Sequence, residues 1–337
     1  ITKPIYMHHL QEFEGIQTED RVFSSELAKD VYLGLSHSPK WLSSKYFYDK
    51  RGDEIFQQIM NMPSYYLTNA EYEIFETHRD KILSAFTKDE KPFRLVELGA
   101  GDGYKTKVLL KDFLSKKADF HYCPVDISGN VLRLLEEDVK SELPNLSIEC
   151  MEGDYFHMLA DIATHNGHRN VVMFLGSNIG NFSENAALDF VKNIRKNIRK
   201  DDLLLLGYDL KKEPKIILEA YNDKEGITAS FNYNLLERIN RELDADFAID
   251  KFQHYASYNP VNGECRSYLL SKQEQSVKIG DLDEVFYLDA WEPIFMEVSN
   301  KYAPHEMRDL MSRAGFEWVE SFTDSNEYYV DGLWRAI

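Results

Sequence analysis

The sequence is short of cysteine, of basic charge and of long hydrophobic runs, and each shortage excludes a class of protein. The three cysteines, Cys123, Cys150 and Cys265, lie far apart, which argues against a disulfide framework or a zinc site and for a reducing compartment. Lysine and arginine number 39 against 57 acids, so the net charge is −18 and a nucleic-acid partner is not expected. No apolar run approaches the roughly 20 residues of a membrane span. We therefore expect a cytoplasmic protein with neither nucleic acid nor membrane as its partner.

Two further absences complete this picture. The ten histidines show no spacing typical of metal ligation, so no metal is predicted. The first residues, Ile1–Pro4, show no charged segment followed by an apolar block, so no signal peptide is expected. The 337 residues, 43% of them hydrophobic, suffice for one large or two modest globular domains.

The rest of the chain is organised around one glycine-rich stretch. A mostly apolar run, Phe93–Leu98, carries Glu97 near its end, glycines follow at positions 99, 101 and 103, and Tyr104–Lys117 has a helical period. Strand, glycine turn and helix predict the first unit of a nucleotide-binding α/β fold, in which glycines let the backbone pass close to a ligand. The glycine spacing differs from the dinucleotide fingerprint. Together with Glu97, it resembles the first motif of class I S-adenosylmethionine (SAM) methyltransferases.

The next two predicted strands end in polar residues. Phe120–Ile127 predicts a strand with Asp126 near its end, where an acid accepts hydrogen bonds from ribose hydroxyls; a helix N-cap would explain the same acid. Leu146–Met151 predicts a third strand. Asp154 and Tyr155 follow it and suit the amino group and ring of an adenine, although a plain turn fits as well.

The remaining strands of the sheet are predicted from two parts of the sequence, 171–208 and the C-terminal region. The stretch 171–182 predicts a buried parallel strand that ends in small polar residues, among them Asn178 and Asn181. A helix over 183–200 and a strand over 202–208 follow. Near the C-terminus, 316–323 and 328–336 predict an antiparallel hairpin of the kind that closes a seven-stranded methyltransferase sheet.

Two segments do not fit this α/β repeat. Residues 1–60 precede it, and Lys211 to about Ser271 interrupts it with two helices and strand-like runs. We predict an α/β, class I SAM-methyltransferase core formed by residues 70–211 and 302–337. Residues 1–69 and 212–301 are predicted to form a second, α+β, substrate-binding domain.

Motifs along nearly the whole chain together resemble the ergothioneine-pathway histidine Nα-methyltransferases. They include Tyr46-Phe-Tyr-Asp49, Met62-Pro-Ser-Tyr-Tyr-Leu-Thr68, Val96-Glu-Leu-Gly99 with Lys105-Thr106, Pro124-Val-Asp126, Phe174-Leu-Gly-Ser177, Ile179-Gly-Asn181, Glu219-Ala-Tyr-Asn-Asp223, Phe252-Gln-His254 and Glu297-Val-Ser299. The resemblance implies SAM as the cofactor and L-histidine, methylated to its Nα-trimethyl form, as the substrate.

The resemblance also implies roles by position. The cofactor-binding residues are then Glu97, Gly99, Gly101, Lys105, Asp126, Asp154, Tyr155 and Gly176. The substrate-binding residues are Tyr65, Asn181, Tyr221, Phe231, Ser267, Glu297 and Ser299, with Tyr48 near the reacting amine as the catalytic residue. Within the substrate set, Asn181 and Tyr221 would hold the α-carboxylate, whereas Tyr65, Glu297 and Ser299 would hold the imidazole. A monomer is expected.

Two departures from the family pattern leave the substrate open. Ser267 stands where the family has an apolar methionine in its pocket, and Tyr155 stands where phenylalanine is common. The first departure favours a second hypothesis, Nα-methylation of another aromatic amino acid or amine. The motifs are also compatible with a SAM-binding protein that lacks catalysis. An NAD-dependent oxidoreductase is disfavoured by the glycine spacing and the terminal hairpin.

Overall fold

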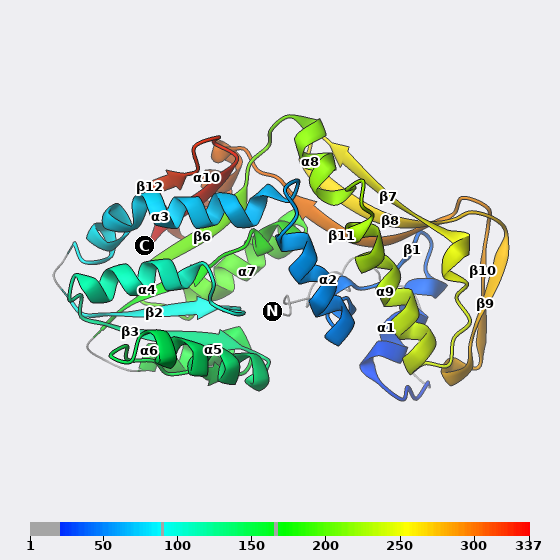
Figure 1. Ribbon diagram of the computed structural model, residues 1–337, viewed down its shortest axis with the longest axis horizontal. Helices are drawn as coiled ribbons and strands as arrows, with labels where there is room; N and C mark the ends of the chain where they lie inside the picture. The colour runs from blue at the N-terminus through cyan, green and yellow to red at the C-terminus, as the bar shows by residue number, and fades with distance from the viewer. Residues whose placement is uncertain (1–20, 89–90, 165–167) are drawn as a thin grey trace. The chain divides into compact units, whose positions relative to one another are not determined.

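The computed structural model describes residues 21–88, 91–164 and 168–337 (Figure 1). Ile1–Pro4 and the beginning of the predicted substrate-binding domain lie outside these residues. The chain divides into two compact units. One comprises Leu67–Lys211 and Lys301–Ile337, and the other comprises Lys212–Asn300 with the described part of Ile5–Tyr66.

The first unit is built on a seven-stranded sheet in the order β12-β13-β6-β5-β2-β3-β4. Its strands are β2 (Phe93–Leu98), β3 (Phe120–Asp126), β4 (Met151–Glu152), β5 (Arg169–Phe174), β6 (Leu203–Asp209), β12 (Phe316–Thr323) and β13 (Tyr329–Ala336). Strands β2 to β6 pair in parallel, whereas β13 pairs antiparallel with β6 and β12 with β13. This order and the terminal antiparallel hairpin confirm the predicted methyltransferase-type sheet.

Helices accompany the sheet in the expected α/β alternation. They are α3 (Tyr66–Phe86), α4 (Thr106–Ser115), α5 (Gly129–Glu142), α6 (Tyr155–Thr164), α7 (Glu184–Lys196) and α10 (Pro304–Arg313). Four phenylalanines join α3, β2, α4 and β3, with ring centroids 5.6 to 6.2 Å apart: Phe86, Phe93, Phe113 and Phe120. Burial of each such side chain stabilises the fold by about 1.5–3 kcal/mol.

The second unit has its own sheets. A four-stranded sheet runs in the order β1-β11-β8-β7, and β9 pairs with β10. The strands are β1 (Lys40–Trp41), β7 (Phe252–Asn259), β8 (Glu264–Ser271), β9 (Gln275–Ile279), β10 (Glu284–Leu288) and β11 (Pro293–Asn300). The helices are α1 (Glu26–Ser36), α2 (Lys50–Met60), α8 (Pro214–Tyr221) and α9 (Ile227–Glu242). Alternate burial along β8 shows that one face of this sheet is covered.

One predicted strand is corrected by the structure, and one open alternative is decided. The strand expected over Leu146–Met151 is reduced to Met151–Glu152, and before it only Ile148 bridges to Tyr122 of β3. The turn considered at Asp154 and Tyr155 begins a helix, α6. Apolar alternation does not reveal whether a neighbouring strand offers its backbone along the same length, which explains the first error.

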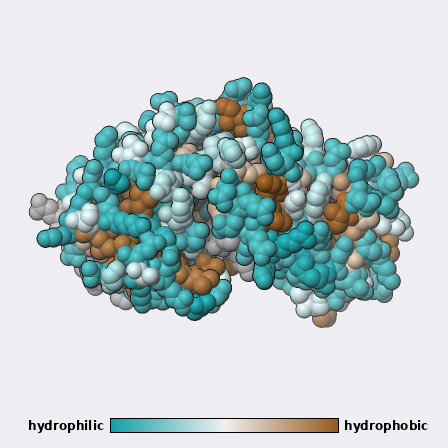
Figure 2. All heavy atoms as spheres, viewed as in Figure 1, coloured by the Kyte–Doolittle hydropathy of each residue, from teal (hydrophilic) through white to brown (hydrophobic). Residues whose placement is uncertain are grey.

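Most of the visible surface is polar. The face shown in Figure 2 is largely hydrophilic, with separate hydrophobic patches. Among the residues that the structure describes, no helix has the length and apolar character needed to cross a bilayer.

Candidate functional site

The glycine turn follows β2 directly. Gly99, Gly101 and Gly103 have φ angles of 73°, 57° and 64°, in the left-handed region that favours glycine. A Cβ at Gly103 would lie 2.6 Å from Cδ1 of Leu135, so the third glycine also permits close packing against α5. The turn thus brings bare backbone to the carboxyl end of β2, the position where open α/β sheets bind ligands.

Glu97 links three elements beneath this turn. Its side chain is buried, its Oε1 accepts a hydrogen bond of 2.6 Å from the Thr106 hydroxyl, and its Oε2 accepts one of 2.5 Å from the Tyr122 hydroxyl. Burial raises the pKa of Glu97 to about 7. These bonds tie β2 to α4 and β3, and the contact with the cofactor remains a prediction.

Asp126 lies buried at the end of β3. Its Oδ1 accepts a hydrogen bond of 2.9 Å from the Ser128 amide, and the Ser128 hydroxyl in turn accepts one of 3.4 Å from Val131. The side chain that caps α5 is therefore that of Ser128. Asp126 is not the N-cap, which was the alternative explanation for an acid at this position.

Asp154 and Tyr155 lie at the start of α6. Asp154 Oδ1 accepts hydrogen bonds from the amides of Phe156 at 3.0 Å and His157 at 3.2 Å, as a helix-capping carboxylate does. Tyr155 is 2% exposed, and burial raises its pKa. The structure thus gives Asp154 a capping role, and the proposed adenine contact of the pair stays a prediction.

Lys105 and Gly176 meet at a residue that sequence reasoning missed, Glu71 of α3. The Lys105 ammonium forms an ion pair with Glu71 Oε2, and the Gly176 amide donates to Oε1 at 2.8 Å. Gly176 follows β5 with a φ of 74°. In the sequence, Glu71 resembles an ordinary acid in the first turns of a helix, and nothing local shows that it is buried.

The cofactor candidates together suit the chemistry of SAM. They lie at the ends of β2, β3 and β5 and after β4, and they combine glycine backbone with one ammonium group, two aspartates and one aromatic ring. Groups of these kinds could pair with the carboxylate, ribose and adenine of the cofactor, and the assignment of each residue stays a prediction. The fit rests on the left-handed glycines, which leave room that a Cβ would fill.

Asn181 is the substrate candidate carried by the first unit. It ends a short turn, Asn178–Asn181, which follows β5. The Ser177 hydroxyl accepts a 3.1 Å hydrogen bond from the Asp209 amide, and the Tyr302 hydroxyl donates to Ile179 O at 3.3 Å. These bonds hold the turn against β6 and the segment after β11.

The remaining substrate candidates belong to the second unit, and five of them gather around α8, β8 and β11. The Tyr221 hydroxyl donates a 2.9 Å hydrogen bond to Ser299 Oγ, and the Tyr65 ring packs edge-on against Tyr221 with centroids 6.2 Å apart. On the sheet, Glu297 is paired with Ser267. Because Glu297 and Ser299 are two residues apart on one strand, both side chains and that of Ser267 share a face.

Tyr48 and Phe231 form an aromatic cluster in the same unit. Their ring centroids are 5.4 Å apart, and Phe56 of α2 lies 5.5 Å from Tyr48 and 5.7 Å from Phe231. Tyr48 is 8% and Phe231 4% exposed. Phe56 completes this cluster and was not singled out in the sequence.

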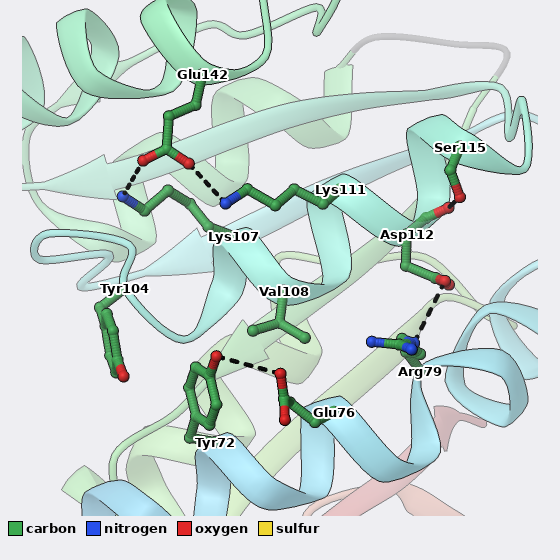
Figure 3. Close-up of a pocket in the computed structure, with 10 residues that line it drawn as sticks. All are labelled: Tyr72, Glu76, Arg79, Tyr104, Lys107, Val108, Lys111, Asp112, Ser115 and Glu142. Atoms are coloured by element: carbon green, nitrogen blue, oxygen red, sulfur yellow. Dashed lines mark hydrogen bonds and ion pairs between the residues drawn. The ribbon is translucent and has the colours of Figure 1, made fainter.

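A pocket of about 660 Å³ lies beside the glycine turn, between α3 and α4 (Figure 3). The rings of Tyr72 and Tyr104 stack with centroids 5.1 Å apart, and Lys107 and Lys111 both point to Glu142. None of the predicted site residues lines this pocket. Its basic side chains are matched by acids, so it is not assigned a ligand.

One group of possible metal ligands occurs in the described part of the chain: His121, Cys123 and Glu149, whose ligand atoms lie within 4.8 Å of one another. The His121 ring contacts the Ser147 hydroxyl at 2.5 Å and Glu149 at 3.3 Å. Burial raises the pKa of Cys123 to about 12, so its sulfur is a thiol at neutral pH, and Arg94 adds a positive charge nearby. We assign no metal to this group.

Comparison with known proteins supplies the family. Residues 27–336 match the family model described as histidine-specific methyltransferase, SAM-dependent. The histidine N-alpha-methyltransferase of Mycobacterium tuberculosis is 37% identical over 298 residues, which cover 88% of this chain and 91% of that protein. The enzyme of the same name from Mycolicibacterium smegmatis is 36% identical with the same coverage.

A more distant relative has a different substrate in its name. The L-tryptophan methyltransferase of Psilocybe serbica is 26% identical over 332 residues, covering 89% of this chain and 90% of that protein. Among solved structures, the mitomycin 7-O-methyltransferase covers 93% of this chain at 11% identity with a TM-score of 0.48. Because that score is low, the strand order is the stronger evidence for the fold.

Proposed function

Because the chain belongs to the histidine-specific, SAM-dependent methyltransferase family, we propose that it methylates the α-amine of L-histidine. Three successive transfers give Nα,Nα,Nα-trimethylhistidine, hercynine. The observation that supports this proposal is the hydrogen bond between Tyr221 of α8 and Ser299 of β11, with Glu297 on the same face of the strand as Ser299. Relatives named ergothioneine biosynthesis protein 1 suggest the route that the product enters.

In this proposal the first unit binds the cofactor. Bound SAM supplies a methyl group that is already activated by its sulfonium. Asp126 accepts hydrogen bonds from the ribose hydroxyls, and Lys105 pairs with the carboxylate of the methionine portion. The left-handed Gly99 and Gly101 let the backbone approach closely.

In the second unit, Glu297 and Ser299 supply the groups that recognise a histidine side chain. An imidazole offers one donor and one acceptor, which suit the Glu297 carboxylate and the Ser299 hydroxyl. Asn181 contributes an amide for the α-carboxylate, and Tyr221 contributes its hydroxyl, whose single hydrogen then turns from Ser299 to the carboxylate. Before the substrate binds, the hydrogen bond between Tyr221 and Ser299 keeps the two hydroxyls at a set separation.

Tyr48 is proposed as the group next to the amine. An α-ammonium has no lone pair, so a proton must leave before each transfer, and Tyr48 or an ordered water relays that proton from the amine to solvent. The neighbouring rings of Phe56 and Phe231 give this site an aromatic wall. Such rings attract a methylated cation as N–H donors are replaced by methyl groups.

A second candidate, another aromatic amino acid or amine as the substrate, is favoured by Ser267. This side chain is 3% exposed and pairs with Glu297 and Ala256 on the neighbouring strands. A serine there occupies less volume than the family's methionine and leaves room for a larger ring. The family assignment excludes an NAD-dependent oxidoreductase and favours an enzyme over a silent SAM-binding protein.

The proposal is tested by a time course with SAM and histidine alone, followed by mass spectrometry. Successive mono-, di- and trimethylated products, with release of S-adenosylhomocysteine, are expected. Release of S-adenosylhomocysteine without any methylated histidine would reject the proposal, and so would no turnover of histidine by a protein that binds SAM.

A further inference from the structure

Glu71 is a buried acid whose carboxylate is contacted from three separate parts of the first unit. It is 0% exposed. Its Oε1 accepts hydrogen bonds of 2.8 Å from the Tyr329 hydroxyl and of 2.8 Å from the Gly176 amide, and its Oε2 pairs with the Lys105 ammonium. One carboxylate of α3 thereby joins β13, the turn after β5 and the start of α4.

The sheet makes room for this carboxylate at Gly207 of β6. A Cβ on Gly207 would lie 2.3 Å from Glu71 Oε1, 2.6 Å from the Tyr329 hydroxyl and 3.0 Å from Asp331 Oδ1. The space where a side chain would stand on this strand is therefore taken by three polar groups. Any residue larger than glycine would displace the carboxylate from the sheet.

Several ionisable groups of this cluster surround Lys105. Burial and the charge of Glu71 hold the pKa of Asp331 well above its ordinary value. Burial and the same charge also raise the pKa of Tyr329 well above its ordinary value. Burial lowers the pKa of Lys105, but Glu71, together with Asp331 and Glu97, raises it, and the net shift is upward. Glu71 thus helps to keep the ammonium charged.

Stability alone is a poor explanation for this arrangement. A buried ion pair contributes little more than well-packed apolar side chains would, because both charges must lose their water. Moreover, Glu71 holds one ammonium group, that of Lys105, and one backbone amide, that of Gly176. Both residues belong to the predicted cofactor set. The Lys105 ammonium lies 3.8 Å from the Cβ position of Gly176, so the groups are neighbours at the sheet edge.

We propose that Glu71 is a positioning residue of the SAM site, which holds the Lys105 ammonium and the Gly176 backbone in place for the cofactor. Lys105 has three N–H donors, and Glu71 fixes the direction of one of them, so the remaining two are oriented. The inference rests on the cofactor-binding part of the proposed function and is independent of which amino acid is methylated.

The test is the affinity for S-adenosylhomocysteine, measured by calorimetry on the full chain. Glu71→Gln keeps the size and an acceptor oxygen but removes the charge. Because hydrogen bonds to charged groups are worth about 1.5–3 kcal/mol, affinity should fall at least about tenfold. The matched control is Glu73→Gln on the same helix, an acid that accepts an exposed hydrogen bond from the Ser325 amide and should leave affinity unchanged.

A double-mutant cycle separates positioning from structural support. In a Lys105→Met background, Glu71→Gln should cause less than about a twofold further loss, because the ammonium is gone and the glutamine oxygen still accepts from the Gly176 amide. Equal losses in both backgrounds, or unchanged or tighter binding in the single variant, would overturn the proposal. A lower melting temperature with unchanged affinity would mean a structural role only and would also overturn it.

If Glu71→Gln does not fold, Tyr329→Phe decides the matter. This change removes one hydrogen-bond donor to Glu71. The affinity for S-adenosylhomocysteine should fall by about threefold, which corresponds to the lower part of the range for a hydrogen bond from a neutral donor. Unchanged affinity would overturn the proposal. Failure of the proposed function is distinguishable, because histidine that is bound but not methylated leaves these affinities and their coupling intact.

Discussion

Replacing Tyr221 by phenylalanine removes one hydroxyl and tests whether this residue binds the substrate. Its hydroxyl donates a 2.9 Å hydrogen bond to Ser299 Oγ, and both side chains are at most 9% exposed. A neutral hydrogen bond of this kind contributes about 1 kcal/mol to stability, so the melting temperature should fall only slightly. If the hydroxyl hydrogen turns to the substrate carboxylate when histidine binds, the loss of that charged hydrogen bond costs about 1.5–3 kcal/mol, or about 10- to 150-fold in affinity.

The assay compares two ligands. The KM for histidine should rise by that factor in Tyr221→Phe, whereas affinity for S-adenosylhomocysteine should stay within about twofold, because the unit that carries Tyr221 contains none of the predicted cofactor residues. Tyr255→Phe on β7, a side chain 49% exposed, is the matched control and should change neither quantity. An unchanged KM for histidine, or parallel losses for both ligands, would refute the role of Tyr221.

Three further predictions concern more residues of the second unit. Glu297→Ala should weaken histidine binding far more than SAM binding, and equal losses measured by calorimetry would contradict the imidazole contact. Ser267→Met should lower turnover of larger aromatic amino acids relative to histidine, and an unchanged ratio of kcat/KM values would show that this position does not select the substrate. Burial lowers the pKa of His254, whose Nε2 contacts Tyr221 O at 3.0 Å, so the folded state favours the neutral ring. Its stabilisation is therefore complete above about pH 6.5 and is lost as the pH falls below that value. His254→Gln should flatten the fall in melting temperature below about pH 6.5, and an equally steep fall would show that different groups cause it.

The sequence predicted the sheet well because its elements carry local signals. The apolar run Phe93–Leu98 and the glycines after it mark a strand and a turn without reference to the rest of the chain. The terminal hairpin was predicted for the same reason. The extent of β4 was wrong because strand length depends on the neighbour, and only Ile148 of the preceding stretch bridges to β3.

The part of the site that sequence patterns missed depends on long-range packing. Glu71 accepts a hydrogen bond from Tyr329, 258 residues away in the sequence, in space that a side chain at position 207 would fill. A glutamate near the start of a helix and a glycine in an apolar strand each have an ordinary local explanation, and only the folded sheet brings them together. Phe56 joins the ring cluster of Tyr48 and Phe231 in the same way. The substrate candidates came from the family resemblance, because hydroxyls and carboxylates on separate strands share no local pattern.

The central claim, methyl transfer to the α-amine of histidine, is tested most directly by competition. The protein is incubated with SAM and an equimolar mixture of the standard amino acids, and the methylated products are identified by mass spectrometry. The account predicts Nα-trimethylhistidine as the main product. Methylated tryptophan or tyrosine in place of histidine would contradict the substrate assignment and point to the space beside Ser267.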